Sequence, residues 1–168
     1  MQNFLTFARI YQLMRKTVPI IMLLVCFFLS ACQRQGKDAV LVQRSFFNET
    51  WERFDYVYNN IEIKQETTYD LSMSISFTDA YPYEDFSMIF TVFDAQGNPY
   101  RSRGYKFKLK DADGNWNSEK IDDCYTFVLP INKELRITEP GTYRFQIEYR
   151  MSKTPIYGVK ELTLYSNN

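Results

Sequence analysis

Apolar and polar residues alternate repeatedly from residue 39 onward. In residues 69–77, leucine, methionine, isoleucine and phenylalanine alternate with serines, and in residues 143–149 aromatic and aliphatic residues alternate with arginine, glutamine and glutamate. A period of two places successive side chains on opposite faces of a β-strand, and no helical period of about 3.6 residues competes with it. Both segments are therefore predicted to be strands with one buried and one solvated face.

Two further strands are predicted from different patterns. Residues 86–93 are apolar on both faces, which is typical of a central strand covered on two sides. Tyr105, Phe107 and Leu109 alternate with lysines, which would face water and discourage pairing between exposed sheet edges. Shorter candidate strands cover residues 39–47, 54–63, 125–129 and 159–165.

Turn signals separate these segments. Residues 94–98 and 111–115 share the form D-A-x-G-N, in which the glycine can adopt a positive φ, and Pro140-Gly141 precedes the strand at 143–149. The repeated turn predicts a three-strand meander over residues 86–115. About eight short strands, regular turns and no long helix predict an all-β fold, a single antiparallel β-sandwich, with Ig-like and jelly-roll strand orders both open.

The N-terminal segment follows a different pattern. Arg9, Arg15 and Lys16 precede an apolar run over residues 18–31. That run is shorter than the about 20 apolar residues of a membrane-spanning helix, and it lacks the polar face of a core helix. A charged lead-in before a short apolar run is typical of a secretory signal peptide.

Leu29-Ser30-Ala31-Cys32 closes this segment and resembles the bacterial lipobox. In a lipobox the cysteine thiol receives a diacylglyceryl group and a peptidase cuts before it, whereas ordinary signal cleavage wants a small residue in place of Leu29. We expect residues 1–31 to be removed as a signal peptide, Cys32 to carry the lipid, residues 32–38 to form a tether and residues 39–168 to form the sandwich domain. Translation is expected to start at Met14, from which the signal is complete, with Met1 as the other start.

Removal of the signal changes the charge balance. The whole chain has 20 basic and 20 acidic residues, and the signal contains only basic ones, so the remaining chain is weakly acidic. Neither a nucleic-acid footprint nor a polybasic membrane patch is present, and acyl chains such as palmitate on Cys32 would attach the protein to the membrane. Because residues 33–37 lack the acidic cluster of some surface-exposed lipoproteins, we expect an outer-membrane anchor facing the periplasm.

The chain contains no histidine. This excludes serine–histidine and cysteine–histidine nucleophile arrangements and imidazole metal sites, and with them most hydrolase templates. Cys124 lies beside Asp122 and Asp123, whose charge disfavours a thiolate, and it is predicted to be a small buried hydrophobe at a strand start. No disulfide, cofactor or catalytic activity is expected.

Acidic clusters offer two weaker candidates. One is spaced somewhat like a calcium loop and consists of Asp111, Asp113, Asn115 and Asp122. Its glycine does not stand at the sixth position, so a plain hairpin turn is favoured. The other could supply the paired carboxylates of a glycoside hydrolase and consists of Glu84, Asp85, Asp122, Asp123 and Glu134. Nothing in the sequence pairs these acids across a cleft, and solvated acids are the simpler interpretation.

Aromatic residues make up 17% of the chain, and Trp116 and several tyrosines lie near turns. Most aromatic side chains are expected in the core. Tyr81-Pro82-Tyr83, however, places two tyrosines at a proline turn, where burying both is awkward. We therefore predict a partner-facing patch at Tyr81 and Tyr83.

A series of short motifs runs in a fixed order along the chain. They are the lipobox, Trp51, Tyr69-Asp70-Leu71, Tyr81-Pro82-Tyr83, Asp113-Gly114-Asn115-Trp116 and Pro140-Gly141-Thr142-Tyr143-Arg144-Phe145. No single motif is specific, and their order and spacing carry the likeness. In these features the chain resembles the gliding motility lipoprotein GldH family of Bacteroidetes over nearly its whole mature length.

The resemblance implies a membrane-anchored envelope lipoprotein that supports gliding motility and associated protein secretion and has no known catalytic activity. Its expected partners are envelope motility or secretion proteins, docked by the anchored β domain. The alternative is a carbohydrate-binding lipoprotein of a polysaccharide-uptake system, which would use the same anchor, sandwich and exposed aromatic residues.

Overall fold

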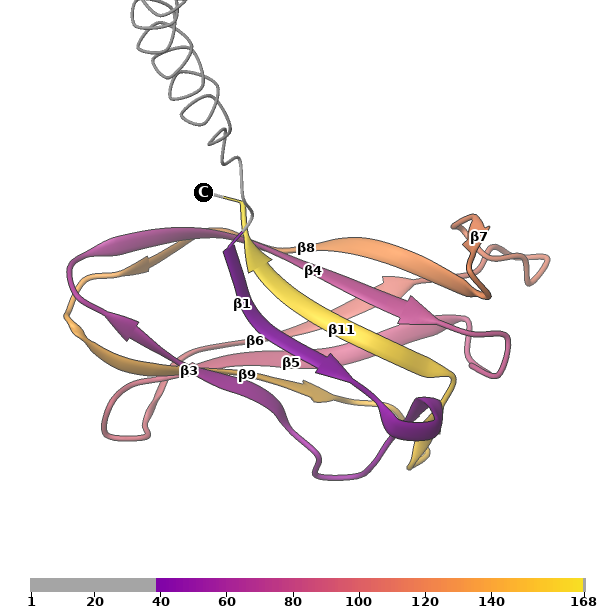
Figure 1. Cartoon of the computed structure of the whole chain (residues 1–168), viewed down its shortest axis with the longest axis horizontal. Helices are drawn as coiled ribbons and strands as arrows, with labels where there is room; N and C mark the ends of the chain where they lie inside the picture. The colour runs from indigo at the N-terminus through magenta and orange to yellow at the C-terminus, as the bar shows by residue number, and fades with distance from the viewer. Residues whose placement is uncertain (1–38, 168) are drawn as a thin grey trace, which may run out of the picture. The chain divides into compact units, whose positions relative to one another are not determined.

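Antiparallel strands build almost the whole of the part that the structure, a computed structural model, describes, which is residues 39–167 (Figure 1). The predicted signal peptide, Cys32 and the tether at 32–38 lie outside the described residues. No helix within the described part is long and apolar enough to cross a membrane. The elements are β1 (Ala39–Ser45), η1 (Phe47–Glu49), β2 (Thr50–Trp51), β3 (Val57–Ile63), β4 (Thr67–Phe77), β5 (Asp85–Phe93), β6 (Pro99–Lys108), β7 (Lys120–Ile121), β8 (Cys124–Ile137), β9 (Gly141–Tyr149), β10 (Ile156–Tyr157) and β11 (Val159–Ser166).

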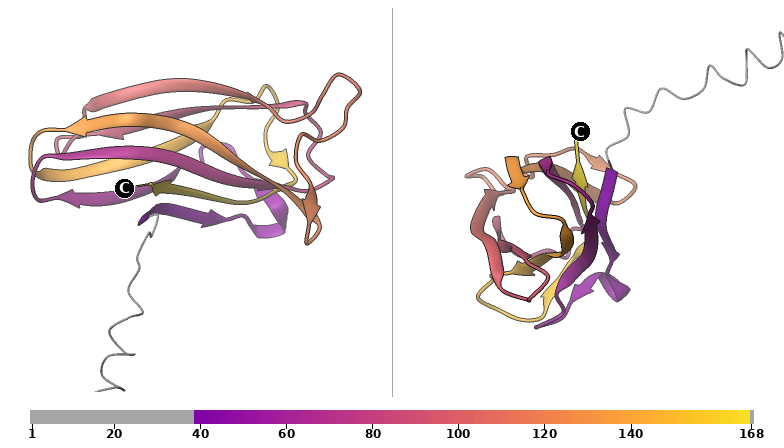
Figure 2. Two further views of the ribbon diagram at one scale, coloured as in Figure 1. Left: turned by 90° about the horizontal axis from the view of Figure 1, so that it is seen from above. Right: turned by 90° about the vertical axis from the view of Figure 1, so that its left-hand side faces the viewer.

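Two sheets face each other around one core (Figure 2). One sheet has the order β1-β11-β4-β8-β7 and the other β3-β9-β5-β6, while β2 and β10 form a small separate pair. Every pairing is antiparallel. The predicted all-β antiparallel sandwich is therefore confirmed. Four long strands lie in each sheet, in the orders β1-β11-β4-β8 and β3-β9-β5-β6, which is the jelly-roll arrangement and settles the strand order that the sequence leaves open.

Period-two patterning accounts for the core. Along β5, Phe86, Met88, Phe90 and Val92 are buried and the residues between them are half-buried. β5 lies between β9 and β6, so its predicted central position is confirmed, but its second face is only partly covered. β4, β9 and β11 show the same one-sided burial over most of their length, which is the physical signature of two sheets packed face to face.

The two D-A-x-G-N turns have different roles. Residues 94–98 join β5 to β6 as a hairpin, as predicted. After residues 111–115 the chain makes one isolated bridge, between Lys110 and Trp116, and then continues to the other sheet. The prediction of a third meander strand after residue 115 is therefore wrong. The physical reason is tertiary packing, because Trp116 stacks on Tyr125 of β8, with ring centroids 4.3 Å apart.

The two long sides of the sandwich are closed differently. On one side Asn59 of β3 donates a hydrogen bond to the carbonyl of Leu41 in β1, at 2.8 Å. On the other side, tyrosine hydroxyls from β6 reach the carbonyls of β8: Tyr100 donates to Arg136 at 2.9 Å, and Tyr105 donates to Ile131. The strands β6 and β8 are thus joined by side chains, without a backbone ladder between them.

Candidate docking surface

Tyr81 does not lie on the surface. Its side chain is 0% exposed, its ring packs 4.4 Å from that of Phe77, and its hydroxyl donates to the carbonyl of Asp85 at 2.8 Å. Tyr83 is half-buried and packs edge-on against Tyr81, with centroids 5.4 Å apart. The predicted exposure of this tyrosine pair is therefore wrong for Tyr81 and only partial for Tyr83.

A close backbone contact explains why the turn folds inward. Gly158 has a φ of +75°, and a Cβ built on it would lie 2.2 Å from the amide nitrogen of Tyr81. The Gly158 carbonyl also accepts a hydrogen bond from the amide of Thr78, at 2.9 Å. Only glycine permits this approach. The close contact places Tyr81, at the start of the proline turn, against the backbone of Gly158.

Cys124 begins β8, as predicted, but it is half-exposed and not fully buried. Its thiol donates to the carbonyl of Ile121, at 3.2 Å. Among the described residues no cluster of three or more cysteine, aspartate or glutamate side chains is arranged to hold a metal ion.

The calcium-like segment is a plain turn. An oxygen of the Asp111 carboxylate accepts hydrogen bonds from the amides of Asp113 and Asn115, at 2.9 and 2.8 Å. The hydrogen bonds from the backbone and the side chain of Asn115, with a smaller contribution from the Asp113 amide, lower the pKa of Asp111, because they stabilise its charged form. The carboxylate is therefore used to hold its own loop, which confirms the favoured interpretation.

Of the other acidic candidates, Glu84 and Asp85 line one hollow of about 320 Å³ together with Lys106 and Lys108. Asp85 makes an ion pair with Lys106, at 2.8 Å. Asp122 and Asp123 form the turn between β7 and β8 with positive φ values of 47° and 63°. Glu134 is exposed on β8. Solvated or ion-paired acids remain the simplest description of these residues.

Four exposed aromatic side chains lie on η1, on the loop between β2 and β3, and on β10. We call this group the aromatic end, and it consists of Phe47 (87% exposed), Phe54 (68%), Tyr56 (38%) and Tyr157 (55%). Phe47 lies in η1, Phe54 and Tyr56 lie between β2 and β3, and Tyr157 lies in β10, which pairs with β2. Single exposed aromatic residues are common, but a group of four around adjoining hollows is typical of an interaction surface.

A rigid support lies beneath the aromatic end. Trp51 is fully buried, and its indole nitrogen donates to the carbonyl of Asp55 at 2.6 Å. The Asp55 carboxylate in turn accepts two hydrogen bonds from the guanidinium of Arg44 at the end of β1, at 3.0 and 3.3 Å. Phe46 stacks on Trp51 with centroids 4.7 Å apart. Hydrogen bonds to both the carbonyl and the carboxylate of Asp55 therefore hold the loop that carries Phe54.

Phe54 adopts an unusual backbone conformation. Its φ is +65°, in the left-handed region that bulky residues rarely occupy. The ring projects into solvent, and the guanidinium of Arg53 lies 4.8 Å from its centroid. Strained backbone of this kind persists only where the surrounding structure holds it, and it concentrates at functional sites.

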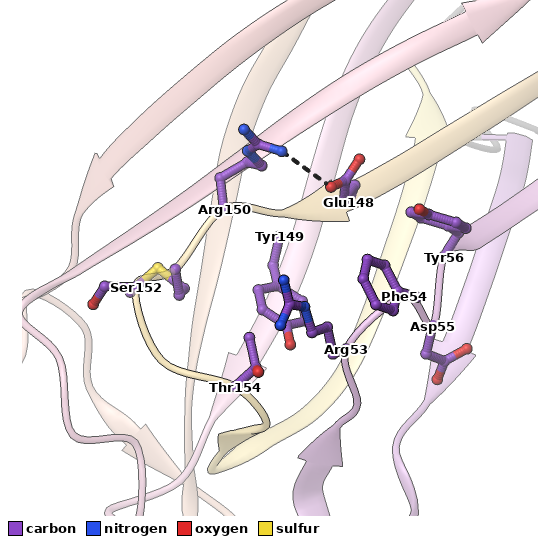
Figure 3. Close-up of a pocket in the computed structure, with 10 residues that line it drawn as sticks. Arg53, Phe54, Asp55, Tyr56, Glu148, Tyr149, Arg150, Ser152 and Thr154 are labelled. Carbon is purple, nitrogen blue, oxygen red and sulfur yellow. Dashed lines mark hydrogen bonds and ion pairs between the residues drawn. The ribbon is translucent and has the colours of Figure 1, made fainter.

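A pocket of about 520 Å³ opens beside Phe54 (Figure 3). One wall comes from the loop between β2 and β3, and the other from the end of β9 and the segment that follows it. Its lining residues include Arg53, Phe54, Tyr56, Glu148, Arg150 and Thr154. A second hollow, of about 400 Å³, shares Asp55 with the first pocket and is bordered by Phe47 and Tyr157.

Two of the charged side chains that line the pocket beside Phe54 form an ion pair. Arg150 donates to Glu148 at 3.3 Å, as the dashed line in Figure 3 shows. Tyr149 is buried, and within the described residues its hydroxyl has no hydrogen-bond partner. Burial raises the pKa of this hydroxyl, and the nearby Glu52 carboxylate adds to the shift, so the tyrosine stays a neutral donor at neutral pH.

Aromatic residues and arginine are enriched in protein interfaces relative to the rest of the surface. The aromatic end presents them on a fixed loop with mixed charges at its border, which suits recognition of a partner. The pattern of the sequence does not predict this surface, because it assigns Phe47 and Phe54 to the ends of strands. Their placement in a short 3₁₀ helix and a loop is what exposes them.

The fold defines an all-β antiparallel sandwich protein. The comparison with protein families then identifies the family, because the GldH lipoprotein model matches residues 41–164. The chain belongs to the GldH lipoprotein family. Membership implies a lipid-anchored envelope protein of gliding motility, and the family is not a known enzyme family.

Two solved structures illustrate the likeness of this chain to known folds. A family 35 carbohydrate-binding module from Clostridium thermocellum aligns with a TM-score of 0.39 and 9% identity, over 76% of this chain and 97% of the module. Latent PorU from Porphyromonas gingivalis aligns with a TM-score of 0.35 and 8% identity, over 77% of this chain and 11% of PorU. These scores are too low to support an argument about function. None of the curated proteins matches the chain.

Proposed function

We propose that this protein is a non-enzymatic envelope lipoprotein that supports gliding motility and the secretion linked to it by docking an envelope partner through its aromatic end. The GldH family supports the lipid anchor and the link to motility. In the proposal, residues 1–31 are a removed signal peptide, Cys32 carries the lipid, and the anchor lies in the outer membrane facing the periplasm.

The observation that carries the docking proposal is Phe54. Its large apolar ring is exposed to solvent on a strained backbone, in a loop that hydrogen bonds from Trp51 and Arg44 hold in place. Folding alone would favour glycine or asparagine at such a backbone position. A phenylalanine there is best explained by contact with another molecule.

The position of the aromatic end also suits an anchored protein. Ala39, where the described chain begins, pairs with Ser166 at the end of β11, and β1 then runs 7 residues toward η1. At about 3.3 Å per residue, the aromatic end lies about 20 Å from the point where the chain enters the domain. In the proposal, the lipid on Cys32 attaches the chain before β1, and the aromatic end follows β1.

The proposal is tested by recovering the lipidated protein from cross-linked cells of its own host under denaturing conditions. The wild type is compared with a Phe54→Ala, Tyr157→Ala double variant and with Val128→Ala, which alters an exposed apolar residue on β8 outside the aromatic end. We expect envelope motility or secretion proteins with the wild type and the Val128 variant, and few with the double variant. Equal recovery from all three proteins would contradict the proposal.

A carbohydrate-binding function is the second candidate. The exposed rings of Phe54 and Tyr56 border a pocket lined by charged side chains, and such rings can stack on sugars. A glycan array probed with the purified protein separates the two functions. Binding of a defined glycan that Phe54→Ala abolishes would favour this second candidate, and absence of binding would leave protein docking ahead.

A further inference from the structure

The edge strand β6 carries an unusual concentration of positive charge. Arg101, Arg103, Lys106 and Lys108 lie within its ten residues, and the strand contains no acidic residue. The chain as a whole is balanced, with 20 basic and 20 acidic residues. Lys106 pairs with Asp85, whereas Arg101, Arg103 and Lys108 make no ion pair with a carboxylate of residues 39–167.

The register places these charges on both faces of the sheet. Arg101 and Arg103 lie opposite Val92 and Phe90, whose side chains belong to the buried face of β5. Lys106 and Lys108 lie on the opposite, solvent-facing side, because strand side chains alternate. Any strand added beside β6 would therefore meet cations on each of its faces.

The free edge of β6 is available for such a strand. β6 is the last strand of its sheet, so the side away from β5 has no ladder partner among the described strands. A groove of about 380 Å³ follows this edge and is lined by Arg103, Tyr105, Pro130, Ile131, Asn132 and Lys133, none of which is acidic. Tyr105 leaves β6 from the buried face to reach β8, and Tyr100, near the start of β6, packs on the buried ring of Tyr143 and also reaches β8. Both tyrosines therefore tie β6 to the opposite sheet without forming a backbone ladder on its edge.

We propose that β6 binds an extended acidic segment of a partner protein, which adds to the sheet as a further strand. Backbone hydrogen bonds along the edge would supply the pairing, and carboxylates opposite Arg101, Arg103 and Lys108 would supply selectivity, since Lys106 is already paired with Asp85. The four cations of β6 lie at relative positions 0, 2, 5 and 7 of the strand. This spacing reads the same in both directions, so it fits an acidic segment in parallel or antiparallel orientation.

The same charges select against a second copy of this chain. Two β6 edges brought together would face each other with like charges, which destabilises cross-strand pairs. Lysine and arginine on an edge strand thus prevent self-pairing and still admit a strand of opposite charge. The occupant is therefore an acidic segment of another protein, and a second copy of this chain is disfavoured.

The test uses the purified full-length protein and a labelled ten-residue peptide with glutamate at positions 1, 3, 6 and 8 and threonine or valine elsewhere. A peptide with lysine in place of each glutamate is the first control. A peptide with the same composition and all glutamates on one face, at positions 1, 3, 5 and 7, is the second. We expect the first peptide to bind, the lysine peptide not to bind, and the one-face peptide to bind more weakly.

Matched variants of the protein examine where the peptide binds. Arg103→Glu turns an opposite-charge pair into a like-charge pair and is expected to weaken binding about fivefold or more. Lys64→Glu makes the same change in net charge in the loop between β3 and β4 and is expected to leave binding within about twofold. Arg103→Gln, which adds no negative charge, is expected to have an intermediate effect and guards against a folding defect.

Amide hydrogen exchange reports whether a strand has been added, because new ladder bonds slow the exchange of β6 amides. Slower exchange across β6 is the expected result. Absence of binding at millimolar peptide, equal weakening by Lys64→Glu, or binding without protection of β6 would each overturn the proposal. Phe54→Gly should bind the peptide like the wild type, so failure here is distinguishable from failure of docking at the aromatic end.

Discussion

Replacing Phe54 by glycine and by alanine separates backbone strain from binding at the aromatic end. Both changes remove the exposed ring and its contact with the Arg53 guanidinium, 4.8 Å away. They differ only in the backbone, since alanine must keep the left-handed conformation with its Cβ, whereas glycine adopts it without that clash.

The magnitude follows from two opposing effects. A non-glycine residue in the left-handed region is destabilised by about 1–2 kcal/mol. Glycine also makes the unfolded chain more flexible, which costs about 0.4–1 kcal/mol relative to alanine. We therefore expect Phe54→Gly to have a free energy of unfolding about 0.5–1 kcal/mol higher than Phe54→Ala, which corresponds to about 2–4 °C in Tm.

Urea unfolding of the two variants, followed by tryptophan fluorescence, measures this difference. Trp51, directly beneath the loop, reports on it. Both variants should lose the partner to the same extent, because the ring is absent from both. If the alanine variant is as stable as the glycine variant, Phe54 is not strained and the argument from its backbone fails.

Three further predictions concern the rest of the domain. Gly158→Ala should lower the free energy of unfolding by about 3 kcal/mol or more in urea, because its Cβ would lie 2.2 Å from the Tyr81 nitrogen; Gly97→Ala, with positive φ but open space, should cost only about 1 kcal/mol. Tyr81→Ala should destabilise the fold by about 3–5 kcal/mol, since it removes a fully buried ring, and equal stability in thermal unfolding would refute its place in the core. The pKa of Asp79 lies below its ordinary value of 3.8 because Lys120 donates a hydrogen bond to its carboxylate. Asp79 therefore stabilises the folded state above pH 3.8, and this stabilisation is lost as the pH falls below that value. Asp79→Asn should make the free energy of unfolding depend less steeply on pH in this acidic range.

Alternation of side chains predicts the strands whose one face is buried in the core. Residues 143–149 and 159–165 fall within β9 and β11, and the one-sided burial of both strands explains why the pattern is clear. The sandwich class follows from such strands and the turns between them. The pairing of strands far apart in sequence, which makes the jelly-roll order, has no local signal.

The pattern fails where local residues and tertiary contacts disagree. Residues 130–137 belong to β8 but contain Pro130 and several charged residues, which obscure the alternating pattern that predicts a strand. Proline is tolerated there because β7 pairs only with the first two residues of β8 and leaves one edge free.

The candidate site is harder to predict than the fold. Tyr81 looks exposed in sequence because it precedes a proline, yet contact with Gly158, 77 positions away, buries it. Phe54 looks like a strand residue, yet its positive φ and the hydrogen bond between Trp51 and Asp55 place it in solvent. The first outcome depends on a contact between distant segments, and the second depends on a positive φ that the alternation of side chains does not encode.

The most direct test of docking at the aromatic end is photo-cross-linking in living host cells. A photoreactive phenylalanine analogue is placed at Phe54 in one strain and at Val128, an exposed residue outside the aromatic end, in another. Our account predicts that position 54 cross-links to an envelope motility or secretion protein and that position 128 does not. Equal cross-linking at both positions, or cross-linking at position 54 to glycan alone, would contradict it.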